Sequence, residues 1–276
     1  MMNTNTMEIV DAHIHIFTGE SRADSLARRA GHENTEEHMR TEYARLGLVG
    51  AVVMSNRTLA LDAHDYPDFL RYCIGLDSFT PWVSDLKASY DLVEGHLQKK
   101  ACVGIKIYPG YIHRYVWDEA YFPVYELAAR YGKPVAIHTG ETATATANLK
   151  YCHPLTLDEL AAAYQKTNFV MCHFGNPWFV DAAAVINKNE NVSVDLSGIL
   201  EGKQDMADFF KEKEGYVEQM RTWISYTGAY DRFMFGTDWP LANIENYIDF
   251  IKYVIPEKHH EKVFAGNARR IYNLDF

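Results

Sequence analysis

Short apolar runs alternate with longer amphipathic stretches along almost the whole chain. Eight such runs lie at residues 8–17, 48–55, 72–76, 103–108, 134–138, 169–173, 192–196 and 233–236. Each is short enough to be a buried strand. Strands that alternate with helices are typical of a parallel sheet, and eight βα units are the number that closes a barrel. The pattern therefore predicts an α/β fold, a (β/α)8 TIM barrel.

The stretches between the runs carry helical signals. Residues 120–131 place apolar side chains at helical spacing and precede Gly132, a residue suited to end a helix. Residues 261–272 form a second amphipathic stretch, which we expect to pack against the first strand. Three connections, at residues 18–47, 110–120 and 197–230, are longer than closure requires and are candidates for pocket walls. We expect one barrel domain over residues 1–276, because this length suits a single barrel.

Charge and composition narrow the class of partner. The formal net charge is -10 and no dense run of Lys or Arg is present, which argues against a nucleic-acid or anionic-membrane partner. No signal-peptide pattern precedes the first run, and no apolar stretch approaches a membrane span. Cys73, Cys102 and Cys172 lie in apolar runs and Cys152 in a loop, with no CxxC pair. We expect a cytoplasmic protein with reduced thiols, of which Cys152 is the candidate for reactivity.

The first run contains the sharpest polar pattern, Asp11-Ala-His13-Ile-His15. Side chains alternate between the two faces of a strand, so Asp11, His13 and His15 are expected to share one face. Two imidazoles one pleat apart can chelate a cation. Asp11, lying deeper, is expected to accept a hydrogen bond from the second ring nitrogen of a ligating histidine.

Other polar residues fall at the ends of later runs. His138 ends the fifth run, His173 ends the sixth, and Asp238 follows the eighth. The C-terminal ends of barrel strands converge on one mouth, where catalytic groups collect. These residues are therefore candidates for metal ligands or proton carriers, in a metal site at the C-terminal end of the strands.

Lys106 lies inside the fourth run, where a charged side chain requires a partner. Three roles are open to it. It can be carboxylated and bridge two metal ions, pair with Asp11 or Asp195, or bind an anionic group of the substrate.

Taken together, these motifs resemble the amidohydrolase superfamily. The segments DAHIHIF, GIKIYP, GKPVAIHTGE, FVMCHFGNPW, VSVDLSG, FGTDWP and FAGNARRIYNL are similar to its amidohydrolase-related (amidohydrolase 2) branch of TIM-barrel hydrolases. That branch also contains aminocarboxymuconate-semialdehyde decarboxylase. The resemblance runs from Asp11 to Leu274.

The resemblance implies roles for individual residues. His13, His15 and His138 would be metal ligands, and Asp238 would be a ligand and the catalytic base. His173 would be a second catalytic group, or a ligand if two metal ions are bound. Lys106 matches the position that is a carboxylated bridge in two-metal members such as dihydroorotase.

This set of residues predicts a metal-dependent hydrolase. Imidazole and carboxylate donors suit Zn²⁺ best, as one or two ions, with manganese, iron or cobalt as alternatives. A metal-activated water would attack an amide, ester or lactone carbonyl, with Asp238 as the base. The alternative is a non-oxidative decarboxylase of a carboxylated aromatic or muconate-like acid. A third interpretation is a non-catalytic barrel with a structural metal.

We expect a small-molecule substrate and, as the default for such enzymes, a homodimer. Two arginines among the candidate contacts favour an anionic substrate. Candidate substrate contacts follow the strands at the same mouth: Arg57, Tyr108, Tyr111, His113, Arg114, Thr139, Glu141, Asn176, Trp178 and Trp239.

Overall fold

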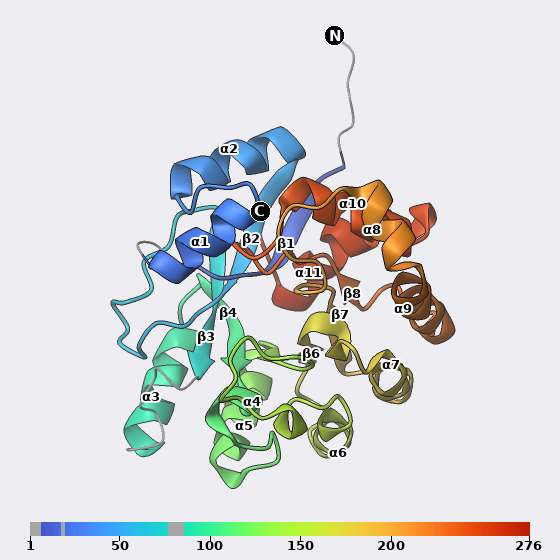
Figure 1. The fold of residues 1–276 in the computed structure, drawn as a ribbon. Coiled ribbons are helices and arrows are strands. Elements are labelled where there is room, and N and C mark those ends of the chain that lie inside the picture. Colours follow the sequence, from blue (N-terminus) through green and yellow to red (C-terminus); the bar gives the residue numbers. More distant parts are fainter. Residues whose placement is uncertain (1–6, 18–19, 77–85) are drawn as a thin grey trace.

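Eight parallel strands pair in sequence order within the residues that the computed structural model describes, 7–17, 20–76 and 86–276 (Figure 1). Part of the predicted 18–47 connection lies outside these residues. The strands are β1 (Ile9–Ile14), β2 (Leu48–Met54), β3 (Leu70–Leu76), β4 (Cys102–Ile107), β5 (Val135–Ile137), β6 (Phe169–Met171), β7 (Val192–Asp195) and β8 (Phe233–Met234). The predicted (β/α)8 barrel is confirmed.

Backbone hydrogen bonds close the barrel between β1 and the segment around β8. The N–H of Ala12 donates to Phe235 at 2.9 Å, and the N–H of Asp238 donates to His13 at 2.9 Å. A third bond joins His15 to the carbonyl of the residue after Asp238. The two ends of the sheet therefore meet at the residues predicted to bind metal.

Helices surround the strands (Figure 1). They are α1 (Ser21–Arg29), α2 (Glu36–Leu46), α3 (Leu86–Leu97), α4 (Pro109–Ile112), α5 (Phe122–Tyr131), α6 (Thr156–Ala163), α7 (Phe179–Lys188), α8 (Met206–Glu212), α9 (Glu214–Thr227), α10 (Ile244–Val254) and α11 (Asn267–Tyr272). The predicted cap at Gly132 is present, because its φ is 60° and its N–H bonds the last turn of α5. A π-helical turn, Lys262–Gly266, precedes α11, and both pack against β1 as predicted.

Two apolar layers hold these elements together. Alternate strand residues such as Val10, Val52 and Val170 fill the barrel interior, where Tyr272 of α11 joins them. The intervening residues pack outward against the helices. Burial of these side chains is the main force that stabilises the barrel.

The strict face alternation predicted for β1 is wrong. The pairing of β1 with β2 shifts register between Asp11 and Ile14, so the pleat is interrupted there. Ala12 consequently lies in the interior cluster with Val10. Asp11 does not share a face with both histidines.

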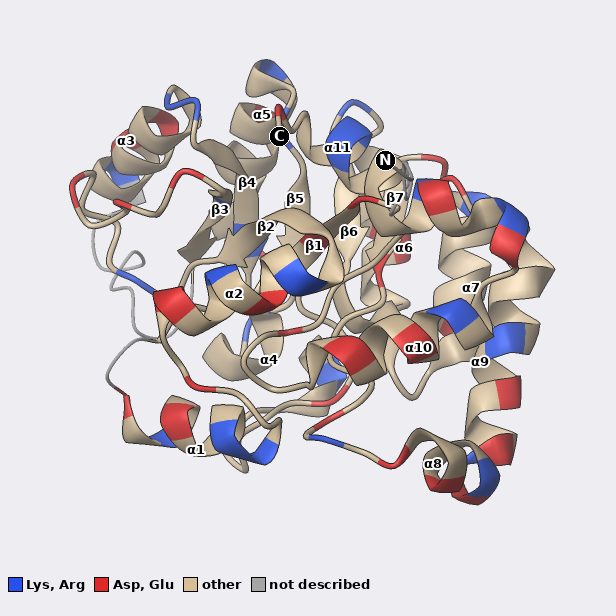
Figure 2. Cartoon of the chain, turned by 90° about the horizontal axis from the view of Figure 1, so that it is seen from above, with Lys and Arg blue, Asp and Glu red and all other residues tan. Residues whose placement is uncertain are grey.

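Charged side chains lie mainly on the outer helices. Figure 2 shows Lys and Arg interspersed with Asp and Glu on helices such as α2 and α9. Across the described residues, every helix falls short of the length and apolar character needed to span a bilayer. The cysteines are buried thiols, and burial raises the pKa of Cys152 to about 11.

Candidate metal centre

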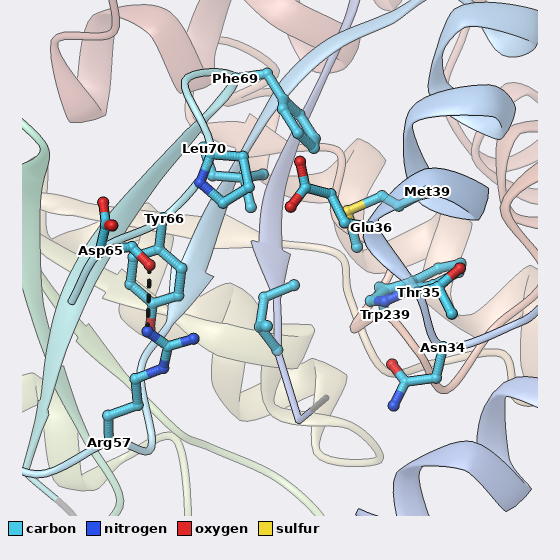
Figure 3. Close-up of a pocket in the computed structure, with 12 residues that line it drawn as sticks. Asn34, Thr35, Glu36, Met39, Arg57, Asp65, Tyr66, Phe69, Leu70 and Trp239 are labelled. Atoms are coloured by element: carbon cyan, nitrogen blue, oxygen red, sulfur yellow. Dashed lines mark hydrogen bonds between the residues drawn. The ribbon is translucent and has the colours of Figure 1, made fainter. Parts of the chain in front are cut away.

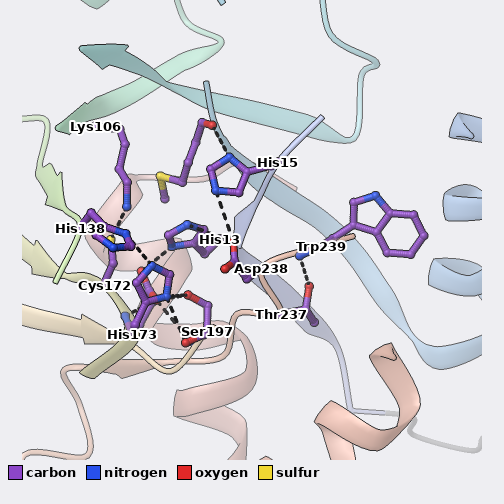
Figure 4. A network of polar contacts seen from close by, with 12 residues as sticks. His13, His15, Lys106, His138, Cys172, His173, Ser197, Thr237, Asp238 and Trp239 are labelled. Atoms are coloured by element: carbon purple, nitrogen blue, oxygen red, sulfur yellow. Dashed lines mark hydrogen bonds and ion pairs between the residues drawn. The ribbon is translucent and has the colours of Figure 1, made fainter. Parts of the chain in front are cut away.

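The polar side chains predicted from the strand ends meet at one mouth of the barrel (Figure 4). In chain order they are His13, His15, Lys106, His138, His173, Asp195 and Asp238. Their backbones belong to β1, β4 and β7 or lie within four residues of the ends of β1, β5, β6 and β8. The fold therefore brings groups from opposite ends of the chain into contact.

His13 and His15 direct equivalent atoms towards Asp238. Oδ1 of Asp238 lies 3.6 Å from Nε2 of His13 and 3.3 Å from Nε2 of His15. The Nδ1 atoms lie 2.9 Å from the carboxylate of Asp195 and 2.9 Å from the carbonyl oxygen of Met54, respectively. Because these oxygens only accept, each ring carries its proton on Nδ1. Both Nε2 lone pairs therefore face Asp238.

His138 and His173 show a related arrangement. Nε2 of His138 lies 2.9 Å from the carbonyl oxygen of Glu141, and Nδ1 of His173 lies 3.1 Å from the carbonyl oxygen of Ser197. These nitrogens must be the donors. The remaining nitrogens, Nδ1 of His138 and Nε2 of His173, face one another at 3.1 Å with lone pairs on both.

This arrangement of electron-rich atoms fits a bound cation. Nε2 of His13 and Oδ1 of Asp238 are buried and have no hydrogen-bond partner among the described residues. The ring of His173 lies 4.8 Å from that of His13, so both histidine pairs border the same space. Lone pairs that converge in this way repel one another unless a positive charge lies between them. The donor set of imidazoles and one carboxylate suits a divalent transition metal.

Two overlapping triads have ligand atoms within 4.8 Å of one another, His13–His15–Asp238 and His13–His173–Asp195. The second is already occupied by hydrogen bonds. Oδ1 of Asp195 accepts the backbone N–H of His173 at 3.1 Å and a bond from Ser197, while Oδ2 bonds His13. The first triad is therefore the better position for an ion, with His138 and His173 beside it.

Burial keeps the histidines neutral. It lowers the pKa of His13 to about 3 and holds the pKa values of His138 and His173 below the ordinary 6.5. The positive charge of Lys106 acts in the same direction on all three. Neutral imidazole is the form that binds a metal, so no proton has to be displaced at neutral pH.

The two carboxylates of the site are ionised. Burial acts to raise the pKa of Asp238, but the neighbouring rings of His15 and His13 hold it below its usual range. Burial opposes ionisation of Asp195 too, but its contact with His13, whose Nδ1–H donates to it, holds the pKa well below the usual range. Asp238 is partly exposed, with 17% of its side chain accessible, and can exchange protons with solvent.

Asp11 does not take the role predicted for it. Asp195 holds Nδ1 of His13, whereas Asp11 accepts bonds from the N–H and hydroxyl of Thr237, at 3.0 and 2.6 Å. Burial raises the pKa of Asp11 to about 7. Because Thr237 immediately precedes Asp238, Asp11 anchors the loop that carries this carboxylate.

Unusual backbone conformations accompany the site. His173, Phe174 and Asp238 have φ values of 64°, 49° and 59°, in the left-handed region that non-glycine residues rarely adopt. Gly198 has φ of 66°, and a Cβ there would lie 2.7 Å from Nδ1 of His173 and 3.1 Å from Oδ2 of Asp238. Only glycine fits at this position, against both side chains.

Lys106 is fully buried, and its Nζ donates to Sγ of Cys172 at 2.8 Å. The ammonium group also lies 5.2 Å from the centre of the Tyr108 ring. Lys106 therefore donates its hydrogen bond to Cys172, and not to Asp11 or Asp195, the two partners considered from the sequence.

Tyr108 and Tyr111 are the predicted substrate contacts that border the histidines. Their rings lie 6.5 and 5.0 Å from the ring of His138. Burial raises the pKa of Tyr111 to about 12, and its hydroxyl accepts the N–H of Ala143 at 2.9 Å. These rings form an aromatic wall beside the candidate metal position.

The remaining candidates after β5 and β6 have partners within the protein. Thr139 is buried and donates to the carbonyl oxygen of Cys172. Asn176 accepts a bond from Tyr216 of α9 at 2.8 Å, and the Trp178 ring packs 4.8 Å from that of His153. The Glu141 residue is exposed, and its carbonyl oxygen is the group that bonds His138. His113 bonds the carbonyl oxygen of Thr146.

Arg57 and Trp239 line a separate pocket of about 160 Å³ (Figure 3). The Arg57 guanidinium lies 4.3 Å from the centre of the Tyr66 ring. Met39 and Leu70, from the outer apolar layer, also line the pocket, so it lies beside the barrel wall. Arg114 instead pairs with Asp118 at 2.7 Å, as an i,i+4 pair. The two arginines predicted to bind an anionic substrate therefore have other partners.

Sequence reasoning missed Asn56, Ser197 and Tyr216. Asn56 Oδ1 lies 2.7 Å from Nδ1 of His15, and Ser197 Oγ lies 2.9 Å from Nδ1 of His173. A signal was present for the first two, because each polar residue closely follows a strand. Tyr216 lies on a helix in a long connection, where the local pattern gives no indication of its contact.

A family model described as amidohydrolase (Amidohydro_2) matches residues 10–274, almost the whole chain. The chain belongs to the amidohydrolase 2 family. The resemblance inferred from the strand-end motifs is confirmed. Membership also supports a metal-dependent enzyme, in agreement with the donor set of this chain.

Among curated proteins, a gamma-resorcylate decarboxylase from Rhizobium radiobacter is 29% identical over 126 residues. The match covers 41% of this chain and 36% of that enzyme. It therefore spans only about a third of the relative's length.

Solved structures share the fold over the whole chain. An uncharacterised TIM-barrel protein from Bordetella bronchiseptica has a TM-score of 0.71 at 20% identity, covering 96% of this chain and 98% of its own. A probable 2-pyrone-4,6-dicarboxylic acid hydrolase from Acinetobacter baumannii has 0.65 at 14%, covering 97% and 100%. A 5-carboxyvanillate decarboxylase from Novosphingobium aromaticivorans, complexed with manganese, has 0.66 at 13%, covering 97% and 96%.

Proposed function

We propose that this member of the amidohydrolase 2 family is a metal-dependent, non-oxidative decarboxylase of a small carboxylated aromatic acid. The identity with gamma-resorcylate decarboxylase is the observation that carries the proposal. It favours the alternative considered from the sequence over the hydrolase that was the first expectation. Hydrolysis remains a second candidate, because a probable pyrone hydrolase shares the fold.

His13, His15, His138 and Asp238 would hold one divalent cation, with His173 beside it. Zn²⁺ and Mn²⁺ both suit these donors, and the manganese in a related decarboxylase makes Mn²⁺ the first ion to test. When bound, the cation would supply Lewis acidity and a fixed positive charge for a substrate oxygen. Asp195 and Met54 hold the rings of His13 and His15 in the tautomer that this binding requires.

Asp238 is the proposed proton carrier. Decarboxylation of an aromatic acid requires a proton at the ring carbon that bears the carboxylate. The bond from that carbon to the carboxylate then breaks, its electron pair returns to the ring, and carbon dioxide leaves. Asp238 is partly exposed and lies at the centre of the site, so it can take a proton from solvent and deliver it to the ring.

The surrounding side chains suit a flat aromatic ligand. Tyr108 and Tyr111 offer ring faces or edges beside His138, and aromatic groups favour offset or edge-to-face contact. His173 is held on one side by Ser197, which leaves its Nε2 atom on the side of the cavity. Neutral histidine at this position would orient a ring substituent through a hydrogen bond.

The test is a carbon dioxide assay on metal-free and metal-loaded protein. The chain is stripped with a chelator, reloaded with Mn²⁺ or Zn²⁺, and incubated with 2,6-dihydroxybenzoate, 5-carboxyvanillate and other carboxylated phenols. We expect carbon dioxide release that depends on metal and falls by at least about 100-fold in Asp238→Asn, a typical loss for a general acid. Asp249→Asn, on α10, is the control.

The same preparations are offered a panel of lactones and esters, including 2-pyrone-4,6-dicarboxylate. Metal-dependent ring opening of a lactone without carbon dioxide release from any acid would overturn the proposal in favour of the hydrolase. Equal carbon dioxide release before and after metal removal would also contradict it.

A further inference from the structure

Lys106 and Cys172 form a buried pair that the proposed chemistry does not use. Lys106 comes from β4, and Cys172 follows β6 directly before His173. Both side chains are fully buried, and Nζ lies 2.8 Å from Sγ (Figure 4). The pair lies beside His138 and His173.

The separation is short for a hydrogen bond to sulfur. Sulfur is larger than oxygen by roughly 0.3 Å, so a relaxed N–H···S contact is expected at about 3.2–3.5 Å. A direct N–S bond would need about 1.7 Å, which requires a much larger movement of both buried side chains. One oxygen atom between nitrogen and sulfur would span about 2.6 Å at ordinary bond lengths and angles. The observed 2.8 Å is close to this last value.

Electrostatics also favour a link between these two groups. A buried ammonium group is unfavourable unless a charged or strongly polar group compensates it. The hydrogen-bond partner of Lys106 among the described residues is a thiol sulfur, a weak acceptor, supplemented by the Tyr108 ring at 5.2 Å. A covalent link that leaves the nitrogen uncharged would remove this cost.

We propose that Lys106 and Cys172 are a site of reversible oxidative cross-linking, in which one oxygen atom bridges Nζ and Sγ. The oxidant is a peroxide. The first molecule of hydrogen peroxide converts the Cys172 thiol to a sulfenic acid and is reduced to water. The second oxidises the sulfenic acid and the Lys106 amine together, forming the N–O bond and releasing two further waters. The ammonium proton is released, and a thiol reductant reverses the link.

The other thiols provide an internal comparison. Cys73 is equally buried and belongs to the same interior cluster. Cys102 donates to the carbonyl oxygen of Gly104 at 3.4 Å, an ordinary contact for sulfur. The proposal therefore predicts that oxidation links Cys172 to lysine while Cys73 and Cys102 do not form such a link.

The test is mass spectrometry of the full chain after treatment with hydrogen peroxide and quenching. The link adds one oxygen and removes two hydrogens, so we expect an increase of about 14 Da that dithiothreitol reverses. Trypsin cleaves after Lys106 only when its amine is unmodified. We expect the uncut peptide 101–114 to be joined to peptide 167–188, which contains Cys172.

Variants separate the link from other oxidation. Cys172→Ala and Lys106→Met should each abolish the gain of about 14 Da, whereas Cys73→Ala should retain it. A loss of about 2 Da, which indicates a direct N–S bond, would overturn the proposal. Trypsin cleavage after Lys106 in the oxidised chain would also overturn it, if Cys172 is then either unmodified or carries oxygen without a link to lysine. The peptide map of the unsubstituted chain decides the matter even if a variant fails to fold.

Discussion

Nδ1 of His13 lies 2.9 Å from one oxygen of Asp195, and the other oxygen of that carboxylate accepts the N–H of His173 at 3.1 Å. One buried side chain on β7 therefore holds a histidine ring from β1 and the backbone after β6. Both contacts act on groups that border the proposed cation. Asp195 is a positioning residue for the whole centre.

Asp195→Asn is expected to weaken metal binding. The amide can present an N–H to His13, which would move the ring proton to Nε2 and remove the lone pair from the metal side. Loss of such an orienting group typically costs about 10–100-fold in metal affinity. Competition titration with a chromogenic chelator measures the change. Asp158→Asn, which affects an ion pair with Lys188 away from the strands, is the control, and equal affinity in both variants would refute the role.

Gly198→Ala is expected to reduce activity at least about tenfold, because the new Cβ would collide with both His173 and Asp238. Catalysis requires both side chains to be placed to within a fraction of an ångström. Gly228→Ala is a matched control: its φ of 59° is similar, but no neighbouring atom lies within 4 Å of the position that its new methyl group would take. Each substitution should cost about 1 kcal/mol from the left-handed backbone alone. Urea unfolding and kcat/KM measured on both variants separate strain from collision.

His32 is expected to make stability depend on pH. Burial, followed by the charge of His38, lowers its pKa from 6.5 to about 4. Between these values the unfolded chain binds a proton that the folded chain does not, so stability is lost as the pH falls from about 6.5 towards about 4. At about pH 5 the loss amounts to about 2 kcal/mol. Between about pH 7.5 and pH 5, the unfolding free energy of His32→Gln should fall by about 2 kcal/mol less than that of the unsubstituted chain. An identical fall in both proteins would show that His32 is not the source of the pH dependence.

Tyr216→Phe is expected to loosen the attachment of α9 to the loop after β6. The variant loses the hydroxyl that bonds Asn176 at 2.8 Å. A lost hydrogen bond of this kind costs about 0.5–1.5 kcal/mol in the free energy of unfolding. Tyr226→Phe is the control, since Tyr226 is 61% exposed. Equal urea midpoints for the two variants would show that the contact does not stabilise the fold.

The strands and the ligand candidates were predictable because each leaves a local signal. Even β8, with only Phe233 and Met234 in regular pairing, is marked by an apolar run before Asp238. Histidines at the ends of such runs converge by the geometry of any parallel barrel. A single strand-end rule was therefore sufficient to identify groups that are distant in the sequence.

The finer geometry was not predictable, because it depends on pairing between segments. The register shift in β1 arises from its fit to β2, and it removes Asp11 from the face assigned to it. Asp195 then fills the expected role beside His13 from another strand of the barrel. Arg114 was a candidate to bind a substrate anion because the sequence reasoning did not consider its ion pair with Asp118, four residues later.

The closure of the barrel between His13 and Asp238 has a consequence for how the protein matures in time. Ribosomal synthesis produces the two imidazoles of the first strand early and the carboxylate that joins them near the end. A nascent chain therefore carries an incomplete set of donors through most of its synthesis. The proposed set of donors is complete only once Asp238 has been synthesised, and a chain terminated before this residue would lack both that carboxylate and the junction that closes the sheet.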